Sequence, residues 1–247
     1  MLSIIGLGIF DENDISLRGL EEIRRSDKAY VEFYTNIWHG DVAKLEKTVG
    51  KKIIALKRRD IEDNNRIISD AKAKNVCLLV PGDPLAATTH AELLLRAKNE
   101  GIETKIIHSS SIFSSVGECG LQLYKFGRTA TIPLPEKTGG VAPESVYDIV
   151  KGNLKLGAHT LLLLDIDVEN KKALSVKEGL ETLKKLDKKK ILGKFVVISM
   201  LGSEKQRIDY GDYGKLSKIN YELPAVIVVP GKLHFAEEEF INAVAFK

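Results

Sequence analysis

The segment that decides the fold covers residues 76–90 and reads VCLLVPGDPLAATTH. Its first five residues form a short apolar run, which predicts a strand buried on both faces of a parallel sheet. Ligands of such sheets bind beyond the carboxyl ends of the strands, so the loop that follows is a candidate site. There Gly82 allows close approach of the backbone, Asp83 offers a carboxylate, and Pro84 restricts the backbone. A rigid turn in which Asp83 merely caps a backbone amide is the simpler alternative.

Strand and helix patterns alternate on both sides of this segment, which predicts a mostly parallel sheet covered by helices. The expected strands are residues 3–5, 29–33, 53–55, 76–80 and 104–107, and the expected helices begin near residue 17 or cover 61–74 and 92–100. Beyond residue 128 the expected strands are 129–132, 160–164, 195–199 and 225–229, and the expected helices are 145–156, 175–187 and 233–245. The pattern changes near residue 120 and then passes through a cluster of prolines and glycines at 133–143. We therefore expect two α/β domains, residues 1–124 and residues 125–247.

Composition excludes several classes of protein. The 247 residues are 29% charged and 44% hydrophobic, and no apolar stretch approaches the length needed to cross a bilayer. The first residues enter a strand pattern without the features of a signal peptide, so we expect a cytoplasmic protein that does not bind membranes. The net charge of +3 gives no argument for direct nucleic-acid binding. Cys77 and Cys119 are too few for a disulfide framework and lack metal-ligand spacing, so we expect both to be reduced and structural, with no metal site.

A second glycine loop, GLGIFD at residues 6–11, follows the first expected strand. It invites comparison with the dinucleotide-binding pattern G-x-G-x-x-G, but Asp11 replaces the third glycine and its negative charge would oppose a pyrophosphate. The loop therefore fits an uncharged or cationic ligand better than a phosphate-bearing cofactor. Glu32, at the end of the second expected strand, is placed to bind a ribose hydroxyl, so a nicotinamide-binding protein remains an alternative.

Five blocks of sequence resemble, in the family's order, the diphthine synthases of the archaeal type. These enzymes belong to the tetrapyrrole methylase superfamily of S-adenosylmethionine-dependent methyltransferases. The blocks are IGLG at 5–8, EFYT at 32–35, PGDPLAATTHAE at 81–92, YKFG at 124–127 and VPGKLH at 229–234. Together they span nearly the whole chain. The resemblance implies two α/β domains with the cofactor cleft between them, and a homodimer.

The resemblance also implies a reaction. Methyl groups pass from S-adenosylmethionine to the amino group of a 3-amino-3-carboxypropyl modification on one histidine of translation elongation factor 2, in diphthamide biosynthesis. The archaeal-type enzymes trimethylate this amine and leave S-adenosylhomocysteine as the product of the donor. A methylase acting on a precorrin-type tetrapyrrole is the alternative within the superfamily. A non-catalytic or nicotinamide-binding α/β protein is the alternative outside it.

The family's cofactor contacts carry over onto positions of this sequence. They are Ile9, Asp83, Ala86, Ser111, Ile112, Leu164, Leu201 and Ala225. Most are small or apolar, which suits a cofactor that is recognised largely by backbone groups. The surroundings of Leu201 and Ala225 depart from the family pattern, which more often has a small residue at the first position and a histidine at the second.

No catalytic residue is assigned from the sequence. Methyl transfer from a sulfonium requires alignment and exclusion of water rather than a protein nucleophile, although the amine must lose a proton, and Asp83, His90 and His108 are candidates for assisting. A group of aromatic residues is expected either to border the acceptor pocket or, as the favoured alternative, to pack in the core. Its members are Tyr30, Phe33, Tyr34 and Trp38. Lys125 and Arg128 are candidate partners for the substrate carboxylate, or else solvated charges.

Overall fold

The chain divides into two units in the computed structural model, which describes residues 1–245. The first unit is Met1–Phe113 and the second Ser114–Lys247, of which residues 246–247 lie outside the described part. The expected boundary lay farther along the chain, between residues 124 and 125. Residues 114–124 join the second unit because Gly120 faces the ring of Phe240, and the Gln122 amide donates a hydrogen bond to Glu237 over 3.0 Å.

The first unit contains a five-stranded sheet in the order β3-β2-β4-β1-β5, and every neighbouring pair is parallel. The strands are β1 (Leu2–Gly6), β2 (Lys28–Glu32), β3 (Ile53–Leu56), β4 (Val76–Val80) and β5 (Thr104–Ile107). All five residues of β4 are buried, as its uninterrupted apolar sequence predicts. Leu78 packs into the core on one face of the sheet and Leu79 into the core on the other.

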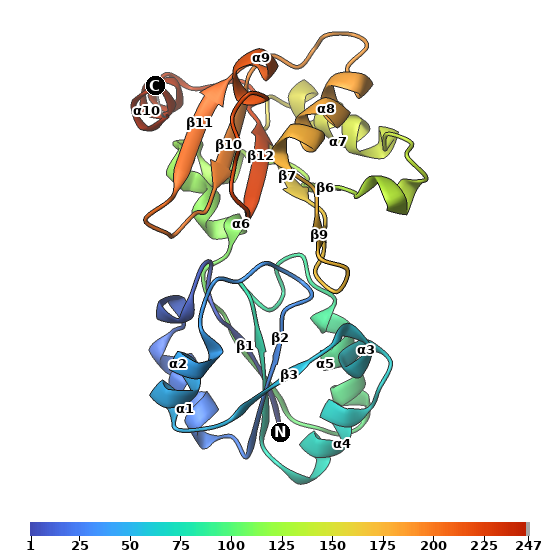
Figure 1. The fold of residues 1–247 in the computed structure, drawn as a ribbon, viewed down its shortest axis with the longest axis vertical. Coiled ribbons are helices and arrows are strands. Elements are labelled where there is room, and N and C mark those ends of the chain that lie inside the picture. Colours follow the sequence, from blue (N-terminus) through green and yellow to red (C-terminus); the bar gives the residue numbers. More distant parts are fainter. Residues whose placement is uncertain (246–247) are drawn as a thin grey trace. The chain divides into compact units, whose positions relative to one another are not determined.

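Helices cover both faces of this sheet (Figure 1). On one side lie α1 (Leu17–Arg25) and α2 (Val42–Val49), and on the other α3 (Arg58–Glu62), α4 (Arg66–Ala73) and α5 (His90–Asn99). The helix expected over residues 61–74 is instead two helices, because the polar run Asp63-Asn64-Asn65 interrupts it. A short 3₁₀ helix, η1 (Glu12–Asp14), separates the first glycine loop from α1.

The second unit contains a five-stranded sheet in the order β11-β10-β12-β7-β6. Its strands are β6 (Ala130–Ile132), β7 (Thr160–Leu164), β10 (Phe195–Ser199), β11 (Arg207–Gly211) and β12 (Ala225–Val229). Only β6 and β7 pair in parallel here, and the other three pairs are antiparallel. A two-stranded hairpin of β8 (Ile166–Asp167) and β9 (Lys172–Ala173) follows β7.

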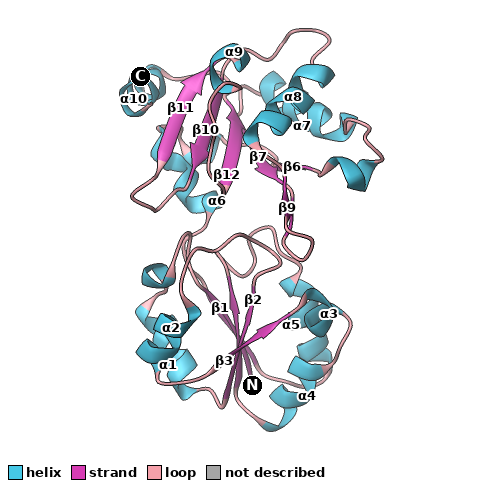
Figure 2. Cartoon of the chain, in the orientation of Figure 1, coloured by secondary structure: helices cyan, strands magenta, loops and turns pink. Residues whose placement is uncertain are grey.

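Helices again flank the sheet of the second unit (Figure 2). They are α7 (Glu144–Lys155), α8 (Val176–Leu186), α9 (Tyr213–Leu216) and α10 (Phe235–Val244), with the 3₁₀ turns η2 (Val116–Cys119), η3 (Leu123–Lys125) and η4 (Pro135–Thr138). The short helix α6 (Ile112–Ser115) carries the chain from the first unit into the second. Both cysteines are buried and free, which confirms their expected structural role. Within residues 1–245, no helix is long and apolar enough to cross a bilayer.

Candidate functional site

The loops that follow β1, β4 and β5 meet at the carboxyl edge of the first sheet, because β1 lies between β4 and β5. The two glycine loops extend the sheet by one antiparallel bridge. In it the Gly82 amide donates to the Gly8 carbonyl over 2.8 Å and the Gly8 amide donates back to the Gly82 carbonyl over 3.2 Å. The two motifs noted in the sequence are therefore parts of one structure.

Glycine is required at these positions for geometric reasons. A Cβ on Gly6 would lie 2.5 Å from the Gly82 carbonyl oxygen and 2.8 Å from the Ser109 Cβ. Gly8 and Gly82 have φ angles of +88° and +74°, in the left-handed region that other residues rarely adopt. Any side chain at Gly6 would force the loops after β1, β4 and β5 apart.

Asp83 holds two of these loops together. Its Oδ1 accepts from the Leu85 amide over 3.0 Å, and its Oδ2 accepts from the Ser109 amide over 3.2 Å and lies 2.7 Å from His108 Nδ1. The turn-capping role considered from the sequence is therefore present. A carboxylate has about four lone-pair positions, so three contacts leave room for one further donor from a ligand.

The five predicted cofactor residues of the first unit gather in these three loops. The Ile9 amide donates to the Ser110 hydroxyl over 3.2 Å, which joins the loop after β1 to the loop after β5. The Ala86 amide donates to the Asp83 carbonyl over 3.1 Å, Ser111 is buried, and Ile112 begins α6. Ser109 and Ser110 were not among the predicted site residues, although the run of serines after β5 indicates a polar loop.

The three predicted residues of the second unit share one edge of its sheet. Leu164 ends β7, Leu201 follows β10, and Ala225 begins β12. Because β12 is antiparallel to both neighbours, its first residue lies beside their last residues, as the pairing of Ala225 with Ser199 shows. All three side chains are buried or nearly so, which is consistent with recognition by backbone groups.

The structure argues against the nicotinamide alternative. The Glu32 side chain is fully buried, and its carboxylate accepts from the Tyr34 amide over 2.8 Å and from the Thr35 amide and hydroxyl. Burial raises the pKa of Glu32 to about 7, against the lowering effect of these hydrogen bonds. Asp11 caps η1 where a dinucleotide-binding loop would enter its helix. Neither residue is available to a dinucleotide.

His90 is buried beside Glu32, with 3.8 Å between His90 Nε2 and Glu32 Oε1. Burial lowers the pKa of His90 to about 4, so the ring is neutral near pH 7. It lies at the start of α5 and connects the end of the Gly-Asp-Pro loop to the loop after β2. Both of its ring nitrogens are buried without a hydrogen-bond partner among the described residues.

The aromatic group packs as the favoured core alternative predicts. Tyr30 is fully buried and donates to Asp70, while Phe33 and Trp38 stack with ring centroids 5.7 Å apart against the core. The Tyr34 ring already has the Arg58 guanidinium 5.5 Å from its centroid. Tyr34, Phe33 and Trp38 pack against the two cores of the first unit, which supports the core alternative.

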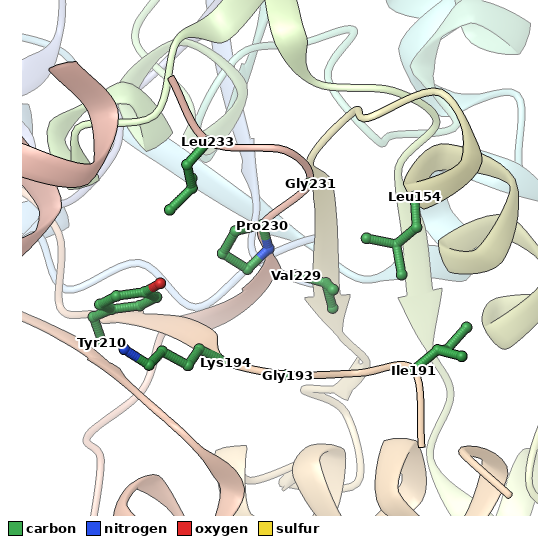
Figure 3. Close-up of a pocket in the computed structure, with 9 residues that line it drawn as sticks. All are labelled: Leu154, Ile191, Gly193, Lys194, Tyr210, Val229, Pro230, Gly231 and Leu233. Carbon is green, nitrogen blue, oxygen red and sulfur yellow. The ribbon is translucent and has the colours of Figure 1, made fainter. Parts of the chain in front are cut away.

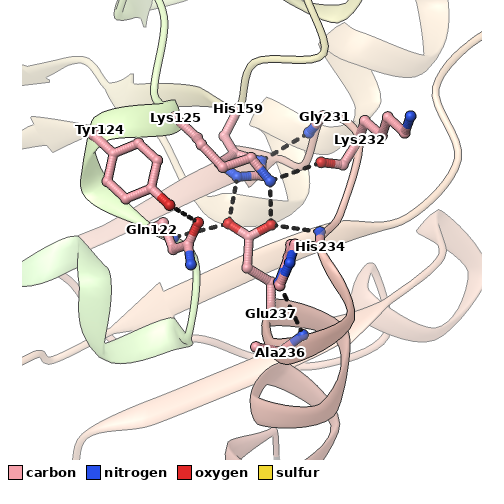
Figure 4. Close-up of polar contacts among 9 residues, drawn as sticks. All are labelled: Gln122, Tyr124, Lys125, His159, Gly231, Lys232, His234, Ala236 and Glu237. Atoms are coloured by element: carbon pink, nitrogen blue, oxygen red, sulfur yellow. Dashed lines mark hydrogen bonds and ion pairs between the residues drawn. The ribbon is translucent and has the colours of Figure 1, made fainter.

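Lys125 is held by a buried carboxylate in the second unit (Figure 4). Its Nζ contacts Glu237 and donates to the Lys232 carbonyl over 2.9 Å. This cluster lies beyond the start of β7 and the end of β12, at the opposite edge of the sheet from Leu164 and Ala225. Lys125 is thus part of a structural ion pair, whereas the Arg128 residue is exposed.

A pocket of about 190 Å³ opens at this same opposite edge (Figure 3). Its lining comprises Leu154, Ile191, Gly193, Lys194, Tyr210, Val229, Pro230, Gly231 and Leu233. The volume is below the roughly 300–1,000 Å³ of ordinary ligand pockets. It contains none of the eight predicted cofactor residues. Among residues 1–245, no group of three or more histidine, cysteine or acidic side chains is arranged to hold a metal ion.

Comparisons with known families, proteins and solved structures identify related methylases, and the matched regions cover most or nearly all of the chain. The family model for tetrapyrrole (corrin/porphyrin) methylases matches residues 1–216. The diphthine synthase of Methanocaldococcus jannaschii is 43% identical over 253 residues, covering 98% of both chains. That of Methanosarcina barkeri is 45% identical over 258 residues, covering 99% of this chain and 96% of the relative. A crystal structure of diphthine synthase matches with a TM-score of 0.90 and 37% identity, covering 99% of this chain and 95% of the other.

Proposed function

Because the chain belongs to the diphthine synthase family of tetrapyrrole methylases and is a methyltransferase, we propose a specific acceptor for it. It methylates the amino group of the 3-amino-3-carboxypropyl side chain on one histidine of translation elongation factor 2. Three methyl groups are added, which gives diphthine in the biosynthesis of diphthamide. The observation that carries this proposal is the similarity to curated diphthine synthases over 98% of the chain.

S-adenosylmethionine supplies the methyl group as an electrophilic sulfonium. In the first unit its contacts are Ile9, Asp83, Ala86, Ser111 and Ile112. The chemistry of these five residues fits the group, because Asp83 retains an acceptor position while the other four are small or apolar. Leu164, Leu201 and Ala225 supply contacts from the second unit through backbone and apolar groups.

For the transfer step itself, the protein acts by aligning the amine with the methyl group and by excluding water from that contact. The paired glycine loops hold backbone groups in fixed positions at the carboxyl edge, so little reorganisation is needed when the reactants bind. The precorrin-type alternative is not favoured, because diphthine synthases from several archaea match 98–99% of the chain.

The test is transfer of label from methyl-labelled S-adenosylmethionine to elongation factor 2 that carries the aminocarboxypropyl histidine. Intact-mass measurement counts the methyl groups. A gain of three supports the proposal, and a gain of four indicates that the carboxylate is esterified as well. If the cofactor binds and no methyl is transferred, the methylase fold is retained but the acceptor is wrong.

The proposed enzyme is a cytoplasmic homodimer, as the family resemblance implies. Large exposed apolar side chains in the second unit, such as Tyr124, Leu156 and Phe235, are consistent with a surface that associates. Light scattering coupled to size-exclusion chromatography would measure the mass directly. A mass of one chain at micromolar concentration would contradict the dimer.

A further inference from the structure

His108 and Asp83 form an oriented pair at the carboxyl edge of the first sheet. Asp83 Oδ2 lies 2.7 Å from His108 Nδ1. An ionised carboxylate only accepts hydrogen bonds, so this contact places the proton of the neutral imidazole on Nδ1. The lone pair of Nε2 is then directed away from Asp83, and 66% of the His108 side chain is exposed.

The carboxylate that orients His108 is itself fixed. Asp83 is only 14% exposed and accepts from the Leu85 and Ser109 amides as well as contacting the imidazole. The backbones of two loops therefore hold the acceptor in place. A base whose orientation is set by a third group is the arrangement found in general-base catalysis on several unrelated folds.

The other candidates are excluded by their surroundings. His90 is buried beside Glu32, and burial lowers its pKa to about 4, so its ring cannot take a proton from a substrate near neutral pH. Asp83 is the orienting group of the pair. Among the three residues considered from the sequence, His108 alone combines an exposed ring with a fixed tautomer.

We propose that His108 is the general base of the methylation, an inference that rests on the proposed function. Nε2 takes one proton from the substrate ammonium. The freed nitrogen lone pair forms the new N–C bond as the C–S bond breaks, and sulfur keeps the electron pair of that bond. Asp83 stabilises the imidazolium until it releases the proton to water. Each of three rounds removes one proton, and the quaternary product has none left to remove.

The first test compares rates of a single methyl transfer over a range of pH. His108→Asn should lower the rate near neutral pH by roughly 10²-fold or more. The deficit should shrink as the pH approaches about 10, because an alkylammonium then loses its proton unaided. Added imidazole should restore His108→Ala, because the His108 side chain is 66% exposed and imidazole can occupy the space it leaves. His234→Asn is the control, since His234 is an exposed N-cap of α10 and asparagine can replace it there.

Two further measurements do not depend on turnover. Calorimetry should show that His108→Asn binds S-adenosylhomocysteine within about twofold of wild type, since a base acts on the acceptor. Nitrogen-15 spectra of histidine-labelled wild type should show protonated Nδ1 and bare Nε2 at His108, and Asp83→Asn should lose this tautomer preference.

The outcomes separate the two proposals. An active wild type with an unchanged His108→Asn rate overturns the base assignment alone. A loss that is equal at every pH, without rescue by imidazole, also overturns it, because it indicates a merely structural role. If wild type transfers no methyl to the modified elongation factor, the proposed function fails and the base assignment falls with it.

Discussion

Two histidine–carboxylate pairs combine the same two chemical groups but have different surroundings. One pair is suited to a structural role and the other to a role in catalysis. At His159–Glu237, the ring is fully buried, Nε2 lies 3.0 Å from Glu237, and Nδ1 accepts from the Gly231 amide over 2.9 Å. Both nitrogens are thus satisfied inside the second unit. At His108–Asp83, Nδ1 contacts the carboxylate and 66% of the His108 side chain is exposed. The first pair can only hold the fold together, whereas the second leaves a nitrogen for a substrate.

In a third histidine–carboxylate pair, neither side chain is exposed. Glu32 and His90 are both fully buried and 3.8 Å apart. Burial raises the pKa of Glu32 to about 7 and lowers that of His90 to about 4, so each shift favours a neutral group. Because neither side chain has an exposed face, this pair takes no part in proton transfer with a substrate.

The largest expected effect is at Glu237, the centre of the buried pair. It accepts from the Gln122 and His234 amides over 3.0 Å and 2.8 Å and contacts Lys125 and His159. Glu237→Gln should lower the free energy of unfolding by about 3 kcal/mol, because it leaves buried partners unpaired. Urea titration measures this change, with the exposed neighbour Glu238→Gln as control. Equal stability of the two variants would mean that the cluster is not structural.

The next effect concerns the glycine loops beside His108. Gly6→Ala should lower the free energy of unfolding by about 1–3 kcal/mol and weaken S-adenosylhomocysteine binding at least about tenfold, since its Cβ meets a backbone carbonyl at 2.5 Å. Gly152→Ala is the matched control, because Gly152 lies in α7 with open space around it. That change should be neutral or stabilising by up to about 1 kcal/mol. Binding by Gly6→Ala at wild-type affinity would contradict the predicted site.

Acid titration of the protein provides a second test of the buried pair, because the pKa of Glu237 differs between the folded and unfolded chain. Burial alone would raise the pKa of Glu237, but hydrogen bonds from His234, Lys125 and Gln122 lower it to about 2 from its ordinary value of 4.5. The unfolded chain therefore binds a proton that the folded chain does not, and stability falls as the pH decreases from 4.5 toward 2. The slope from this residue is at most about 1.4 kcal/mol per pH unit. Glu237→Gln should lose that part of the slope, and an unchanged acid transition would disprove the assignment.

The smallest expected effect is on stability at the exposed pair. His108→Asn should change the free energy of unfolding by no more than about 0.5 kcal/mol, because the exposed His108 side chain contacts Asp83 and water can replace that contact. His159→Asn is the matched change in the buried pair and should cost about 2 kcal/mol or more. Urea titration of both variants measures the difference. Similar costs would remove the distinction between the two pairs.

Most elements of the fold could be predicted because their signals are local. The apolar run of β4 and the expected strands of the first unit are confirmed, as is the parallel sheet. Several elements were not predicted, among them α2, β11, α9 and the hairpin of β8 and β9. Helix α2 is short, and its only strong sequence signals are the caps Asp41 and Gly50 at its ends. Strand β11 is an edge strand that alternates polar and apolar residues over only five positions, which gives a weak signal.

The sequence by itself determined the strand-loop-helix unit around Asp83 and the family to which the chain belongs, because propensities, turn residues and motifs are properties of adjacent residues. Only the tertiary structure decided which histidine can act on a substrate. His90 and His108 look equivalent in the sequence. In the structure, however, His90 is buried beside Glu32, whereas His108 is exposed and contacts the carboxylate of Asp83, which follows a different strand. Burial and orientation depend on strand order, because placing β1 between β4 and β5 brings Asp83 to His108.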